Sequence, residues 1–116
     1  MVLLNLPYPP SVNTYYRRGR FATYLSQAGR KYKEDVAEAL IEQSAPKLGD
    51  AKLKISMILR PRDKRKIDID NRIKAVLDSL QDAGLFDDDY QIDELSIIRG
   101  KPIKDGRLVV IIEEIV

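Results

Sequence analysis

The chain has 116 residues, 44% hydrophobic and 33% charged, so it is long enough for one domain with a real core and too rich in apolar residues to be disordered. It contains neither cysteine nor histidine, which excludes disulfides, thiolate and imidazole metal sites and the commonest general base. The net charge is +2, but the charges are unevenly distributed: residues 1–66 carry 14 Lys/Arg and 6 Asp/Glu, whereas residues 67–116 carry 6 Lys/Arg and 12 Asp/Glu. The basic half suits a surface that binds a polyanion, and the acidic half offers carboxylates for a hard cation.

The first half of the chain predicts two strands, a helix and a third, shorter strand. Residues 2–6 favour a short strand that three nearby prolines end, and residues 20–24 are a candidate for the shorter strand. Ser26 is a suitable N-cap, and apolar residues at helical spacing predict a helix over about 26–44. Alternating apolar residues predict a strand with one buried face over residues 53–59.

The second half predicts a further helix and two strands. A charged loop at residues 61–67 leads to a helix that starts near Asp70 and stops at Gly84. An acidic loop follows at residues 85–89. The last two predicted elements are strands at 91–98 and 107–116, joined across 100–106 with the turn at 104–106. This order predicts one domain, residues 1–116, of mixed α/β or α+β class, with a mixed sheet and two main helices.

The start of the chain and its hydropathy indicate a cytoplasmic protein. No apolar run approaches the roughly 20 residues of a membrane helix. The first eight residues lack the basic start and the long apolar stretch of a signal peptide. We therefore expect the cytosol as the compartment and no membrane partner.

The stretch KRKIDIDNRIKAVLDSL, residues 64–80, places two aspartates between a basic run and a helical apolar pattern. Asp68 and Asp70 are two residues apart, so in an extended segment both carboxylates point to the same side. Two convergent carboxylates are a ligand pair for Mg²⁺, which binds oxygen and takes further ligands from a substrate phosphate. The alternative is that both aspartates only cap the helix and complement its dipole, and composition alone weighs the two equally.

Other charged residues strengthen the hypothesis of a metal site. Asp87, Asp88 and Asp89 follow the helix and offer a third acidic ligand, provided that the sheet order returns this loop to the site. Lys74 lies four residues after Asp70, where an ammonium group can stabilise charge on a phosphate. The plainer alternatives are a solvated acidic loop and an ordinary i,i+4 ion pair.

A second group of residues combines basic and aromatic side chains, as in proteins that bind nucleic acid through phosphate contacts and base stacking. A merely soluble basic loop is the plainer interpretation, but a carboxylate pair of the Mg²⁺ type has an evident use in a basic patch only when a phosphate is present. Besides Phe21, the residues predicted to contact nucleic acid are Tyr15, Tyr16, Arg17, Arg18, Arg20, Arg30, Lys31, Lys33, Arg62, Lys64, Arg65 and Lys66.

Five segments carry a family resemblance: LPYPPSVNTYYR, YLSQAGRKYKEDV, DIDNRIKAVLDSLQDAG, DDDYQI and KPIKDGRLVVIIEE. Through them the chain resembles, over nearly its whole length, the RusA family of Holliday junction resolvases. The resemblance implies a RusA-like fold and a homodimeric, Mg²⁺-dependent endodeoxyribonuclease of the kind often encoded by phages and prophages, with Mn²⁺ as an alternative ion. Such an enzyme resolves four-way junction DNA by paired symmetrical nicks in recombination and repair.

The resemblance also implies roles for single residues. Asp68, Asp70 and Asp89 fall on the catalytic metal ligands of the family, and Lys74 falls on a catalytic lysine. The family pattern in the acidic loop is two aspartates, one further residue and Gln, and the extra aspartate of this chain makes Asp88 a substitute for Asp89.

Two residues that flank Asp68 and Asp70 complete the comparison with the family motif. Asn71 matches the motif and is expected to help shape the start of the helix. Ile67 departs from it, because a family member has an arginine implicated in activity directly before the first aspartate. Lys66 or Arg65 is the candidate for supplying that charge.

Two symmetrical cuts suit a dimer with two-fold symmetry, which presents two identical sites to the junction. We expect a metal-activated water to attack the phosphorus in line while Lys74 stabilises the transition state. Tyr15, Tyr16 or Phe21 is expected near the unstacked crossover. The alternatives are a noncatalytic branched-DNA-binding module, a structural or protein-binding dimer, and a metal nuclease that acts on other branched DNA.

Overall fold

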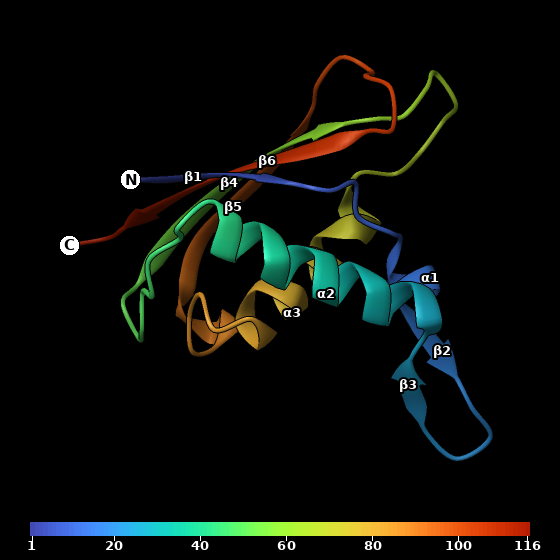
Figure 1. Ribbon diagram of the computed structural model, residues 1–116, viewed down its shortest axis with the longest axis horizontal. Helices are drawn as coiled ribbons and strands as arrows, with labels where there is room; N and C mark the ends of the chain where they lie inside the picture. Colours follow the sequence, from blue (N-terminus) through green and yellow to red (C-terminus); the bar gives the residue numbers. More distant parts are fainter.

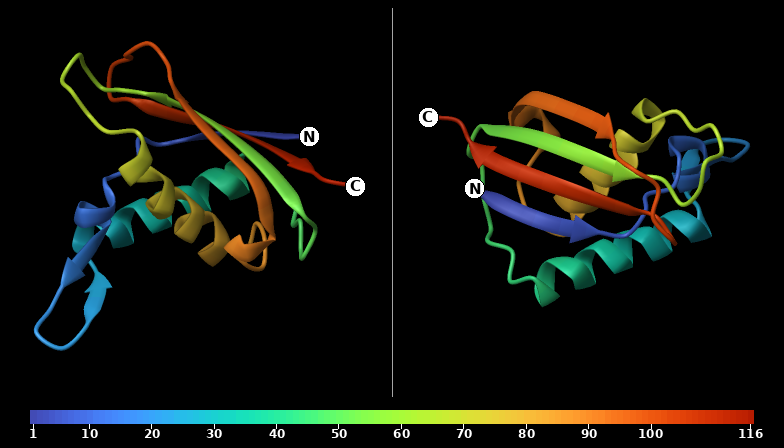
Figure 2. Two further views of the ribbon diagram at one scale, coloured as in Figure 1. Left: turned by 180° about the vertical axis from the view of Figure 1, so that it is seen from behind. Right: turned by 90° about the horizontal axis from the view of Figure 1, so that it is seen from above.

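The computed structural model describes residues 1–116 and contains a four-stranded sheet with helices on one of its faces (Figures 1 and 2). The strands are β1 (Val2–Leu6), β4 (Leu53–Arg60), β5 (Ile92–Arg99) and β6 (Arg107–Glu114), in the spatial order β1-β6-β4-β5. β4 and β5 are parallel, whereas β6 is antiparallel to both β1 and β4. The mixed sheet and its helical layer confirm the predicted α+β class.

The remaining elements cover the sheet or project from its end. They are α1 (Val12–Tyr15), β2 (Tyr16–Arg18), β3 (Thr23–Leu25), α2 (Gln27–Glu42), the 3-10 turn η1 (Asp70–Arg72), α3 (Ile73–Asp82) and the 3-10 turn η2 (Asp89–Gln91). β2 and β3 form a separate hairpin that extends away from the sheet beyond α1 (Figure 1). None of the helices is long and apolar enough to cross a lipid bilayer.

The core lies between the sheet and the two longer helices. α2 begins at its predicted N-cap, where Ser26 Oγ accepts a hydrogen bond from the Gly29 amide at 2.9 Å. Residues at helical spacing on α2 and α3 bury their side chains against alternate residues of β4, which confirms the predicted inward face of that strand. α3 ends before Gly84, whose φ of +85° is a conformation that glycine adopts without strain.

The structure corrects three predictions about the elements. The last two strands are not neighbours, because β4 lies between β5 and β6. The short strand near residues 20–24 is Thr23–Leu25 and pairs with an unpredicted strand, Tyr16–Arg18. The second helix begins at Asp70 only as a 3-10 turn and becomes α-helical at Ile73.

Candidate metal and DNA site

Asp68 and Asp70 lie on the exposed side of the segment that leads into α3. Ile67 and Ile69, which alternate with them, are partly buried against the core. The packing of these two isoleucines therefore turns both carboxylates to solvent. Arg99, at the end of β5, fixes the segment by donating a hydrogen bond from Nη2 to the Ile67 carbonyl oxygen at 2.9 Å.

Neither aspartate acts as a helix cap. The N-cap positions of η1 and α3 are Ile69 and Arg72, and no side-chain hydrogen bond caps either element. Asp68 and Asp70 also take no part in an ion pair. Exposed carboxylates that cap no helix and form no ion pair are free to bind a cation, so this observation favours the metal interpretation over the capping one.

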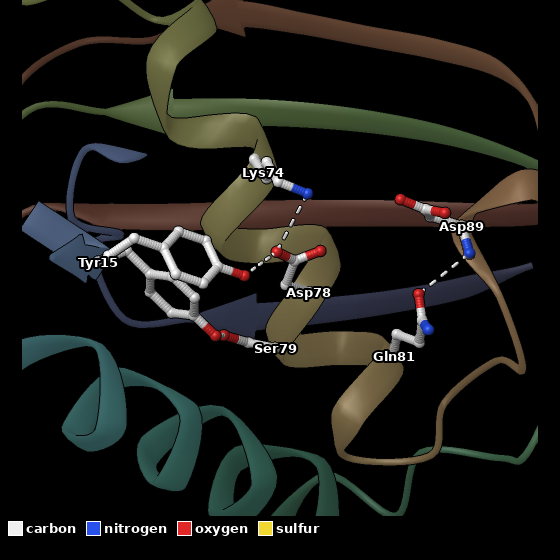
Figure 3. Close-up of polar contacts among 7 residues, drawn as sticks. Tyr15, Lys74, Asp78, Ser79, Gln81 and Asp89 are labelled. Carbon is white, nitrogen blue, oxygen red and sulfur yellow. Dashed lines mark hydrogen bonds and ion pairs between the residues drawn. The ribbon is translucent and has the colours of Figure 1, made fainter. Parts of the chain in front are cut away.

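Lys74 is bound to Asp78 rather than to Asp70. The distance from Lys74 Nζ to Asp78 Oδ2 is 3.3 Å, and the Tyr16 hydroxyl donates a hydrogen bond to the same carboxylate oxygen. Figure 3 shows the Lys74 ammonium and Asp89 on the same side of α3. The alternative of an i,i+4 ion pair between Asp70 and Lys74 is therefore wrong, and Lys74 faces the acidic loop.

The acidic loop presents Asp89 and uses Asp88 internally. The Asp88 side chain caps η2 by accepting a hydrogen bond from the Tyr90 amide at 3.0 Å, and this bond lowers the pKa of Asp88. The Asp89 amide donates to Gln81 Oε1 at 3.1 Å, which docks the loop on α3. A hydrogen bond with Asp88 raises the pKa of Asp89, and the charge of Lys74 opposes the rise. Asp89 is thus the better placed of the two as a ligand.

Gln91 holds the acidic loop to the loop before β4. Its side-chain oxygen accepts hydrogen bonds from the amides of Asp87 at 3.0 Å and Asp88 at 2.9 Å. Its side-chain nitrogen donates to the carbonyl oxygens of Gly49 and Ala51 at 2.9 and 2.5 Å. Gln91 is buried, so the position of Asp89 depends on this network.

The donor chemistry of the three predicted ligands suits Mg²⁺, whereas their spacing does not form a complete cage. Asp68 and Asp70 lie at the start of α3, and Asp89 lies across from Lys74. No group of three or more acidic side chains is close enough to hold a metal ion by itself. Because Mg²⁺ keeps several waters and needs only one or two carboxylates beside a substrate phosphate, a pair of free carboxylates satisfies its requirement for protein ligands.

The residues predicted to contact nucleic acid fall into three groups in the structure: buried, ion-paired and unpaired. Tyr15 does not belong to it, since this side chain is fully buried and its hydroxyl is 3.0 Å from Ser79 Oγ. Tyr16 is partly buried and bound to Asp78. Three predicted cations are in ion pairs, namely Lys31 with Asp35, Lys33 with Asp82 and Arg65 with Asp63. Those without an acidic partner are Arg17, Arg18, Arg20, Arg30, Arg62, Lys64 and Lys66.

Sequence reasoning missed three residues that shape this site. Asp78 lies four residues after Lys74, an i,i+4 spacing visible in the sequence. Gln91 is part of the acidic-loop motif, but its burial depends on the loop before β4. Arg99 had no local signal, because its partner Ile67 lies 32 residues earlier in the chain.

Comparisons with known proteins show the family to which the chain belongs. Residues 7–113 match the family described as Endodeoxyribonuclease RusA. The chain is 41% identical over 110 residues to the crossover junction endodeoxyribonuclease of Enterobacteria phage HK97, with 95% of this chain and 92% of the phage protein covered. It is 38% and 37% identical to the enzymes of the same name from Enterobacteria phage 82 and Escherichia coli K12, over 96% of this chain and 92% of each relative.

Proposed function

Because the chain belongs to the RusA family of endodeoxyribonucleases, we propose that it resolves four-way DNA junctions by Mg²⁺-dependent cleavage in recombination and repair. The observation that carries the proposal is the pair of exposed carboxylates, Asp68 and Asp70, which cap no helix and form no ion pair. Unpaired cations on the preceding loop, Arg62, Lys64 and Lys66, provide the charge that attracts a phosphodiester.

In this proposal Asp68, Asp70 and Asp89 would hold the ion jointly with the substrate phosphate, because the three side chains alone do not lie close enough to form a metal site. When bound, the ion would supply Lewis-acid activation of water and charge stabilisation. Mn²⁺ accepts the same oxygen ligands and is the alternative ion. The three aspartates come from the two ends of a segment that α3 and Gln91 hold in place. Asp88 is excluded as the preferred third ligand because it caps η2.

Lys74 provides positive charge toward the scissile phosphate. Asp78 orients it through the 3.3 Å ion pair, and the Tyr16 hydroxyl orients Asp78 in turn. Asp78 and Tyr16 are therefore positioning residues, whereas the Lys74 ammonium is the group that meets the developing charge.

The missing positive charge at Ile67 is replaced from elsewhere in the fold. Arg65 is held by Asp63, with Nη2 at 2.8 Å from the carboxylate, so it is poorly suited to the role. Lys66 has no acidic partner, and Arg99 places its guanidinium at the Ile67 carbonyl. Arg99 and Lys66 together supply the charge beside Asp68.

A second copy of the chain is the proposed partner in a symmetrical dimer. The sheet face opposite the helices is uncovered (Figure 2). Ile98, Ile58 and Val109 lie side by side on that face across three strands, and Leu3 and Ile111 pair with each other in the neighbouring row. An uncovered apolar face of this kind favours association, and a two-fold dimer offers one site for each of two paired cuts.

Cleavage of a synthetic four-way junction tests the proposal when compared with a flap and a linear duplex of the same sequence, each in Mg²⁺, Mn²⁺ or EDTA. We expect cuts confined to the junction and none in EDTA. Equal cutting of the flap would favour a broader branched-DNA nuclease. Tight junction binding without cutting in either metal would favour the noncatalytic binding module.

A further inference from the structure

Two arginines that flank the carboxylate pair in the sequence meet a single tyrosine. Arg62 comes from the loop after β4, and Arg72 is the last residue of η1. Their guanidinium carbons lie 5.0 and 4.9 Å from the centroid of the Tyr8 ring. At these distances the negative face of an aromatic ring attracts a cation and fixes the guanidinium group.

Close packing fixes the positions of Tyr8, Arg62 and Arg72. Gly106, in the turn before β6, has a φ of +68°, and a Cβ atom there would lie 2.5 Å from Tyr8 Cδ1 and 2.8 Å from Arg62 Cγ. Only glycine therefore lets the Tyr8 ring and the Arg62 stem pack against the turn. Arg72 Nη1 is fixed separately, since it donates a hydrogen bond to the Pro9 carbonyl oxygen at 2.6 Å.

Neither arginine has an ion pair of its own. Asp63, whose pKa is lowered chiefly by hydrogen bonds from Arg65 and also by the charge of Arg62, is bound to Arg65. The buried Nε of Arg72 has no hydrogen-bond acceptor. A buried cationic donor without an acceptor is unfavourable, so a fold that keeps one points to a ligand that completes it. The two side chains, with Tyr8, line a cavity of about 320 Å³ on the side of α2 and another of about 240 Å³ on the side of Lys66.

We propose that Arg62 and Arg72 clamp a backbone phosphate of the DNA directly beside the catalytic carboxylates, an inference that rests on the proposed function. Guanidinium groups bind phosphate oxygens through paired donors. Arg72 is two residues after Asp70, so their backbones lie within about 7 Å of each other, and the clamp is built on the chain segment that carries the carboxylates. Tyr8 is the positioning residue that holds both cations, and neither Tyr8 nor Arg72 was among the nucleic-acid contacts predicted from the sequence.

Junction binding in EDTA, followed by fluorescence anisotropy over a series of NaCl concentrations, tests the clamp without cleavage. We expect Arg62→Gln with Arg72→Gln to weaken binding roughly tenfold or more and, because one phosphate contact is lost, to make the slope of log K against log[NaCl] shallower by about 0.9. Arg72→Lys keeps the charge but not the paired donors, so its slope should match the wild type while its affinity falls. Lys47→Gln removes an exposed, unpaired charge beyond the far end of α2 and should leave both quantities unchanged.

Binding by the double variant at wild-type affinity and slope would overturn the clamp. Thermal melting checks that each variant is folded. If the double variant unfolds, Arg62→Gln alone, at an exposed position, carries the test, with an expected loss of affinity of about threefold or more and a slope change smaller than about 0.9. Cleavage by the wild type is scored separately. A wild type that binds through the clamp but never cuts would contradict the proposed function and leave the clamp intact. A wild type that cuts the junction while the double variant binds it normally would contradict the clamp and leave the proposed function intact.

Discussion

At the scale of single residues, the carboxylates of Asp68 and Asp70 are charges that nothing else in the fold uses. We expect Asp68→Asn and Asp70→Asn to change the free energy of unfolding by less than about 0.5 kcal/mol and to slow junction cleavage more than about 100-fold, because loss of a metal ligand costs several kcal/mol of transition-state stabilisation. Urea unfolding and single-turnover cleavage measure the two effects, with the exposed Asp50→Asn as control. Destabilisation by 1 kcal/mol or more would indicate a capping role instead.

Two buried tyrosines predict how stability depends on pH. Burial raises the pKa of Tyr15 and of Tyr32 above the ordinary value of 10.0. The folded state therefore favours the neutral phenol, and this contribution to stability is complete below pH 10 and is lost as the pH rises further. Urea unfolding should give a steeper loss above pH 10 in the wild type than in Tyr32→Phe. The exposed Tyr24→Phe should behave as the wild type, and identical curves for Tyr32→Phe and wild type would contradict the prediction.

The residues of the carboxylate pair were predictable because spacing and chemistry are local properties of a sequence. The burial of Tyr15 was not predictable, because two adjacent tyrosines in a short segment show no periodicity that would tell which one is buried. The buried contact of Tyr15 is with Ser79, 64 residues away. The role of Arg72 was likewise not predictable, because it depends on contacts with Tyr8 and Pro9 that no sequence pattern indicates.

At the scale of elements, the buried Gln91 makes four hydrogen bonds, two to amides of its own acidic loop and two to carbonyl oxygens of the loop before β4. We expect Gln91→Ala to destabilise the protein by about 2–4 kcal/mol, because it leaves buried backbone groups without partners. Cleavage should fall as well, since the network sets the position of Asp89. Gln43→Ala is the matched control, because Gln43 makes two hydrogen bonds with Asn5 at an exposed position, and its loss should cost about 1 kcal/mol or less. Equal destabilisation by both variants would contradict this account.

Most elements were predictable from periodicity and end signals, as the Ser26 cap and the alternation in β4 illustrate. The partners of the strands were not. β5 lies next to β4 in parallel, although the turn before β6 favours a hairpin. Strand order depends on how the helices cover the whole sheet, and the placement of Asp89 opposite Lys74 follows from that order rather than from local sequence.

At the scale of the whole molecule, the uncovered sheet face predicts a dimer. We expect the wild type to sediment as a dimer and Ile98→Lys to sediment as a folded monomer, because a charge at this 58% exposed position opposes burial against a second sheet. Ile41→Lys, at an exposed position on α2, should remain dimeric. A wild type that stays monomeric throughout the micromolar range would contradict the dimer.

The central claim, junction resolution by paired cuts at two identical sites, is tested most directly on a supercoiled plasmid that extrudes a cruciform. Two cuts made within the lifetime of one complex linearise the plasmid, whereas independent nicks relax it to an open circle. We predict linear product with Mg²⁺, with both ends mapping to symmetrical positions at the base of the cruciform, and no product with EDTA or with Asp70→Asn. Open circles alone, or an Asp70→Asn variant as active as the wild type, would contradict the account.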